Sequence, residues 1–97
     1  MTDDKIYDGD VGVKFKVDTL VDCSAATGFY LKVTLPGGTT TRWTAMLSPT
    51  WNRMIEYNSV PGDMVAGNYI ICSYVEWSPA SVHTGTPFKV KVLEVFK

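Results

Sequence analysis

The chain has 97 residues, of which 45% are hydrophobic and 20% are charged, and its net charge is −1. A chain of this length and composition is expected to fold as one globular domain around a single core, without a stabilising metal or disulfide, rather than to be disordered. Because no excess of basic residues attracts a phosphate backbone, we expect no nucleic acid among its partners.

The N-terminal residues Met1–Lys5 contain no apolar stretch of the kind found in a secretory signal. No apolar run elsewhere approaches the length of a membrane span, so we expect a soluble protein, made in a cytoplasm, with no membrane partner. Residues 1–8 are expected to form a flexible N-terminal arm. Residues 1–97 are expected to be a single domain, because the sequence has no internal repeat and no low-complexity linker.

Apolar and polar residues alternate with a period of two along much of the chain, which is typical of half-buried β-strands. The first two such runs are Val11–Val17 and Phe29–Leu35. The turn residues Pro36–Gly38 then connect the second run to Thr39–Leu47, which is rich in β-branched residues and contains a tryptophan. This arrangement predicts a β-hairpin.

Three further strands are predicted in the second half of the chain, at Met54–Tyr57, Asn68–Trp77 and Phe88–Phe96. The run Asn68–Trp77 is long, aromatic and β-branched, so we expect it to be a central strand. Met64–Gly67 is predicted to form a single helical turn that ends at Gly67. Lysines alternate with apolar residues in the first and last runs, so they are expected on the solvent side of their strands: Lys14, Lys16, Lys89 and Lys91.

Tyr69 comes at the start of the predicted central strand and follows Asp63, Ala66 and Gly67. This order is typical of the tyrosine corner of immunoglobulin-like domains, in which the hydroxyl bonds back to the backbone just upstream. The alternative is an ordinary turn that leads to a core tyrosine. The strand spacing agrees with the corner. We therefore predict an all-β fold, an immunoglobulin-like antiparallel β-sandwich of about seven strands with no significant helix.

The two cysteines and Trp43 follow the order Cys, Trp, Cys of antibody domains. In those domains the second Cys is two residues after the corner Tyr and shares its face, whereas Cys72 is three residues after Tyr69. Cys23 lies in a turn rich in Ser, Ala and Thr. We therefore predict two free thiols. The core side of the strand is expected to carry Tyr69, Ile71, Val75 and Trp77, and the outward side Ile70, Cys72, Tyr74 and Glu76.

Short motifs follow one another along nearly the whole chain: Ile6–Gly12, Val21–Gly28, Leu35–Thr40, Trp43–Ala45, Val60–Asp63, Ala66–Tyr69 and Tyr74–Trp77. In this order they resemble a family of small bacteriophage virion proteins. That family includes the immunoglobulin-like domain at the start of phage baseplate upper proteins and free-standing short relatives. The resemblance implies a β-sandwich component of a virion, and Cys23 stands where relatives tend to have Leu, which implies a buried or half-buried thiol.

Residues that could carry chemistry are few and scattered. His83 is the only histidine, so it is expected at the surface rather than in a metal site or a catalytic triad. The cysteines lack metal-binding spacing. The acidic pairs Asp3-Asp4 and Asp8–Asp10 do not match a calcium loop and are expected to be solvated, with weak calcium binding as the alternative. We predict no catalytic residues, no cofactor and no metal.

Exposed aromatic and apolar residues are the remaining candidates for function. Trp51 precedes Asn52 and Arg53 in a predicted loop, where it is either a plug for a satellite core or an anchor for a partner. Ile70, Cys72 and Tyr74 are expected to form a flat outward patch for a neighbouring subunit. The candidate contact residues are therefore Ile70, Cys72, Tyr74, Trp51 and Arg53.

Two functions fit these features. The first is a non-enzymatic structural component of a phage particle, in the tail, the baseplate or a capsid decoration, which binds other virion proteins in a symmetric multi-copy assembly. The second is a carbohydrate- or receptor-binding module whose platform would be Trp51, Arg53 and Tyr57.

Overall fold

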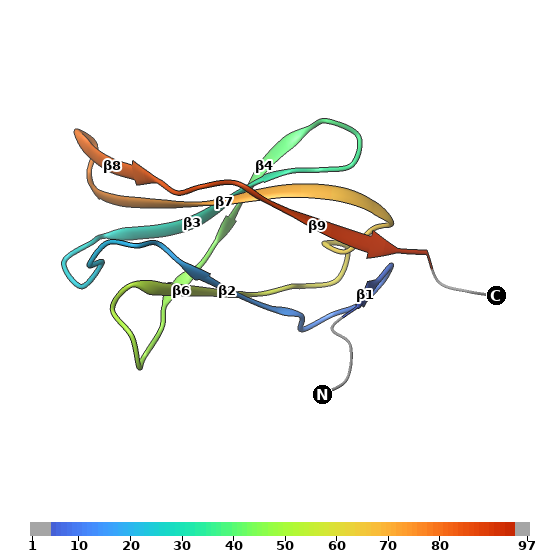
Figure 1. Cartoon of the computed structure of the whole chain (residues 1–97), viewed down its shortest axis with the longest axis horizontal. Coiled ribbons are helices and arrows are strands. Elements are labelled where there is room, and N and C mark those ends of the chain that lie inside the picture. The colour runs from blue at the N-terminus through green and yellow to red at the C-terminus, as the bar shows by residue number, and fades with distance from the viewer. Residues whose placement is uncertain (1–4, 95–97) are drawn as a thin grey trace.

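The computed structural model of the protein describes residues 5–94, and this part of the chain is all-β, with nine strands and no helix. Figure 1 shows the strands. Their bounds are β1 Ile6–Tyr7, β2 Lys14–Asp18, β3 Gly28–Thr34, β4 Thr40–Thr44, β5 Met46–Leu47, β6 Met54–Asn58, β7 Gly67–Ser78, β8 Ser81–Thr84 and β9 Phe88–Leu93. The all-β prediction is confirmed, and the count exceeds seven because β1, β5 and β8 are short pieces.

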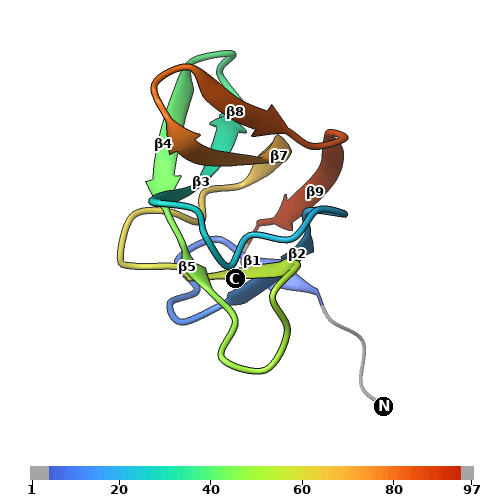
Figure 2. The same ribbon diagram turned by 90° about the vertical axis from the view of Figure 1, so that its left-hand side faces the viewer.

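The strands form two sheets. The large sheet has the order β1-β9-β7-β3-β4, with β8 also paired to β7, and the small sheet has the order β2-β6-β5. Figure 2 shows the large sheet above the small one. All pairs are antiparallel except β1 with β9, which is parallel. The expectation of a wholly antiparallel arrangement is therefore wrong at this edge.

The predicted hairpin is present as β3 and β4, which pair from Tyr30 opposite Thr44 to Thr34 opposite Thr40. The Leu35 N–H donates to the Thr39 carbonyl, and the Gly38 N–H donates to the Leu35 carbonyl. Gly38 has a φ of +91°, a left-handed conformation that suits glycine. The Pro-Gly-Gly signal was thus sufficient to place this turn.

The second half of that hairpin differs from the prediction, because Thr39–Leu47 is divided between the two sheets. β4 belongs to the large sheet, whereas β5 pairs with β6 in the small sheet. Between them the Ala45 N–H donates to the Phe29 carbonyl. The chain therefore crosses from one layer to the other within a single run of alternating residues.

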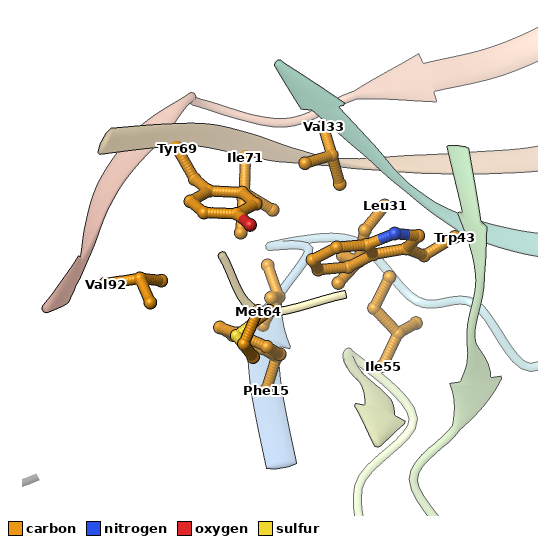
Figure 3. Close-up of a cluster of buried hydrophobic side chains, with 10 residues drawn as sticks. Phe15, Leu31, Val33, Trp43, Ile55, Met64, Tyr69, Ile71 and Val92 are labelled. Carbon is orange, nitrogen blue, oxygen red and sulfur yellow. The ribbon is translucent and has the colours of Figure 1, made fainter. Parts of the chain in front are cut away.

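The core lies between the two sheets (Figure 3). Trp43 is at its centre, and its ring is stacked on Tyr57 with 4.8 Å between centroids and 14° between planes. Phe15 of the small sheet and Tyr69 of the large sheet pack on the same indole at 5.7 and 6.3 Å. Aromatic packing thus joins the two layers.

Tyr69 forms the predicted corner. Its hydroxyl donates to the Asp63 carbonyl at 2.6 Å and accepts from the Val65 N–H at 2.8 Å. The helical turn predicted at Met64–Gly67 is wrong. The segment before β7 is instead an irregular loop whose Met64 side chain is 1% exposed and points into the core. Gly67, with a φ of +135°, is already the first residue of β7.

The chain ends also differ from expectation. Ile6 and Tyr7 of the expected N-terminal arm form β1 and lie opposite Val92 and Leu93, so this part of the arm belongs to the sheet. Residues 1–4 of the arm lie outside the described residues. The last strand ends at Leu93, and the predicted continuation to Phe96 also lies largely outside them.

We expect Tyr69→Phe to lower the free energy of unfolding by about 1 kcal/mol, because the ring still packs but two partly buried backbone groups lose their partner. Urea denaturation measures this change. The matched control is Tyr74→Phe, since the Tyr74 hydroxyl makes no hydrogen bond within residues 5–94. Equal stability of the two variants would contradict a structural role for the corner.

Candidate functional site

The outward side of the large sheet is the surface on which the predicted contact residues meet. Along β7, Tyr69, Ile71 and Val75 are fully buried, whereas Ile70 is 43% exposed and Cys72, Tyr74 and Glu76 are half-buried. The predicted alternation is thus confirmed, although Trp77 is only half-buried. We call this surface the outer face. It also includes the outward residues of the neighbouring strands β3, β4, β8 and β9, which are Tyr30, Lys32, Arg42, Val82, Lys89 and Lys91 among others.

Two cation–π contacts lie at the centre of the outer face. The Lys32 ammonium is 4.0 Å from the centroid of the Tyr74 ring, and the Arg42 guanidinium carbon is 4.2 Å from that of Tyr30. The two rings are 6.3 Å apart. Contacts of this kind contribute roughly 0.5–1 kcal/mol at exposed sites. They hold both cations flat against the sheet.

Lys32 and Arg42 are also direct cross-strand partners. Like charges at directly opposite positions destabilise a sheet by a few tenths of a kcal/mol or more. The cation–π contacts with Tyr74 and Tyr30 offset this repulsion. The fold therefore places two like charges side by side on an exposed face and compensates them with tyrosine rings rather than with carboxylates.

The same face gathers two further cations. Lys89 lies opposite Ile70 and Lys91 lies opposite Asn68, so both lysines project on the outward side, as predicted. Within residues 5–94, none of the four cations forms an ion pair, and Glu76 is the only carboxylate among the paired positions of this face. The four cations come from three different strands, and the strand order brings them together.

The two cysteines lie in different environments. Cys72 lines an open groove on the outer face together with Lys32, Thr34, Arg42, Ile70 and Pro87. Cys23 is 0% exposed, and its thiol shares a 3.1 Å hydrogen bond with the Thr19 hydroxyl. Both thiols are free, as predicted, and Cys23 is buried, as the family resemblance implied.

Trp51 and Arg53 lie elsewhere, in the loop between β5 and β6 at the edge of the small sheet (Figure 2). Trp51 is 44% exposed, so the core-plug alternative is wrong. The Arg53 guanidinium carbon is 5.4 Å from the centroid of the Trp51 ring, and its Nη2 is 3.4 Å from the Asp18 carboxylate. The contact candidates are therefore divided between two separate surfaces.

Tyr57, the third member of the expected sugar platform, does not join Trp51. Its ring stacks on Trp43, and its hydroxyl donates to the Asp63 carboxylate at 2.5 Å. Burial, followed by this hydrogen bond and the charge of Asp63, raises the pKa of Tyr57 well above its usual value. The hydroxyl stays neutral and acts as a structural donor.

Little else in the described part of the chain suggests reaction chemistry. Residues 5–94 contain no group of three or more His, Cys, Asp or Glu side chains placed to hold a metal ion. His83 is half-buried on β8, opposite Val75, and lines an open groove beside Ser73 and Phe88. No helix in this part of the chain is long and apolar enough to cross a membrane.

Comparison of the chain with protein-family models, with curated proteins and with solved structures gave no match. Function must therefore be argued from the outer face and the Trp51 loop.

We expect Cys72 to react with a thiol reagent in the native protein and Cys23 to react only after unfolding, because Cys72 lies in an open groove and Cys23 is enclosed. Absorbance of the released thiolate counts the reactive thiols with and without denaturant. Cys72→Ser should abolish the native reaction, and Cys23→Ser should preserve it. A native reaction that persists in Cys72→Ser would show that the described burial is wrong.

Proposed function

We propose that the two sheets form an immunoglobulin-like sandwich. In such domains one sheet has the strand order B-E-D and the other has G-F-C, extended by C′ in variable-type domains. The orders β2-β6-β5 and β9-β7-β3-β4 fit these series, and Tyr69 supplies the corner. Ile71 then takes the position of the second antibody Cys. One departure is that the buried Trp43 lies on β4, the C′ counterpart, rather than on β3.

We further propose that the protein is a non-enzymatic structural component of a bacteriophage particle that acts through protein contacts of its outer face. The observation that carries this proposal is the like-charged pair of Lys32 and Arg42, held over Tyr74 and Tyr30 beside the exposed Ile70. Aromatic residues and arginine on a pre-organised surface are typical of protein interfaces. The order of motifs along the chain supports the choice of a virion.

The proposed mechanism is multivalent. One copy of the outer face is expected to provide only a weak contact with a neighbouring subunit. Repetition of that contact around a symmetric particle multiplies its effect. Lys32 and Arg42 lose little side-chain entropy on binding, because the tyrosines already hold them. Pre-organisation of this kind favours assembly without a conformational change.

Tyr74→Ala tests this role. We expect the isolated variant to stay folded, because the ring lies on the outer side of the sheet, but to be incorporated into particles several-fold less, because Lys32 loses its support. Mass spectrometry of purified particles made with the variant gene measures incorporation. Met46→Ala, an exposed apolar change on the small sheet, is the matched control. Incorporation of Tyr74→Ala equal to that of Met46→Ala would refute the proposal.

A second candidate is a carbohydrate-binding module, and the specific observation in its favour is the exposed Trp51 with Arg53 over its ring. A tryptophan face beside a guanidinium suits the apolar side of a sugar ring. The groove next to it adds hydroxyl and amide groups from Ser48, Thr50 and Asn52.

This candidate predicts that a glycan array yields specific ligands and that one of them changes the fluorescence of the native protein but not that of Trp51→Ala. Trp43 and Trp77 remain in that variant as internal references. An array without ligands, or binding that survives Trp51→Ala, would count against a sugar site in this loop.

A further inference from the structure

Positive charge is concentrated on the outer face, whereas one end of the molecule carries more carboxylates than cations. The outer face carries four cations and one carboxylate, although the net charge of the chain is −1. The remaining surface is therefore acidic overall. Because opposite fields on two surfaces of the same molecule attract one another between copies, this asymmetry bears on what the outer face binds.

Several acidic residues gather at the end of the molecule where β1 and β9 both finish (Figure 1). Asp8 and Asp10 follow β1, and Glu94 follows β9. The nearby cations are Lys5 and, at the border with the outer face, Lys91, which lines the same hollow as Glu94. We call this surface the acidic end. It also exposes four apolar side chains, 40–58% accessible, which are Tyr7, Val11, Val60 and Val65. It thus combines apolar contact area with a charge opposite to that of the outer face.

The acidic end is held in shape by backbone bonds between segments far apart in the sequence. The Asp8 N–H donates to the Leu93 carbonyl, and the Gly9 N–H donates to the Met64 carbonyl, both at 2.8 Å. The Asp8 carboxylate also accepts from the Ala66 N–H at 3.1 Å. A surface fixed in this way loses little entropy when it is covered.

We propose that the partner of the outer face is the acidic end of a second copy of this chain. A two-fold contact of one outer face with another is disfavoured, because it would bring Lys32, Arg42, Lys89 and Lys91 of both copies together. Contact between outer face and acidic end instead pairs unlike charges and covers Ile70 with apolar side chains.

Such a contact is heterologous, so a pair of copies retains one free face and one free end, and further copies add head to tail into a ring or a filament. This inference rests on the proposed function, since it names the partner of the same face. In this arrangement a single kind of contact, repeated from copy to copy, is enough to build a repeated structure from one short chain.

The experiment uses two variants that each damage one surface. The face variant is Lys32→Gln with Arg42→Gln. The end variant is Asp8→Asn with Asp10→Asn, in which an amide oxygen still accepts the N–H groups of Ala66 and Tyr7. The control is Lys14→Gln with Lys16→Gln, an equal loss of charge on the small sheet. Circular dichroism confirms that all three are folded.

Sedimentation equilibrium measures association. We expect the natural chain to associate in low salt and to do so less in about 1 M salt, where the Debye length falls to about 3 Å. Each damaged variant alone should associate about tenfold more weakly or not at all, and the control should behave as the natural chain. An equimolar mixture of the two damaged variants should form a one-to-one heterodimer and nothing larger, because only one intact face and one intact end remain.

A natural chain that stays monomeric in low salt up to the highest soluble concentration would overturn the head-to-tail contact. The contact would also be overturned if the face variant associated as strongly as the natural chain, or if the mixture of the face and end variants stayed monomeric. In any of these cases, loss of Tyr74→Ala from particles would still support the proposed function, and the outer face would then bind a different virion protein.

Discussion

The hydrogen bonds around Asp63 are the constraint on which the rest of the structure depends. The backbone carbonyl of Asp63 accepts from Tyr69 of the large sheet, and its carboxylate accepts from Tyr57 of the small sheet. Tyr57 in turn stacks on Trp43 in the core. One residue therefore fixes the start of β7 relative to both layers. Since side chains in a strand alternate with a period of two, a shift of one residue at this point would exchange the buried and outward sides of β7.

The register of β7 also determines the outer face. Tyr69 lies on the core side near the start of β7, so Tyr74 lies on the outward side opposite Tyr30, and Cys72 lies opposite Lys32. The cation–π contacts and the groove follow from that pairing. The stability of the core and the composition of the exposed face are thus set by the same interaction.

The repulsion between Lys32 and Arg42 is a cost that a fold selected for stability alone could avoid with a neutral residue at either position. Costs of this kind that persist at exposed positions are typical of functional surfaces. The net charge of −1 gives no sign of an uneven charge distribution. The strand order shows instead that positive charge is concentrated on one face of the large sheet and leaves the remainder acidic.

The sequence by itself determined the all-β class, the β3–β4 turn, the corner at Tyr69 and the two sides of β7. Each of these depends on residues close together in the chain, through a period of two or a turn with fixed spacing. The tertiary structure alone decided that the chain crosses between sheets at Ala45, that Trp51 is exposed, and that β9 and β4 flank β7 and β3. Alternation shows which side of a strand is buried but not which strand lies beside it. The gathering of Lys32, Arg42, Lys89 and Lys91 into one face could therefore be seen only once the strand order was known.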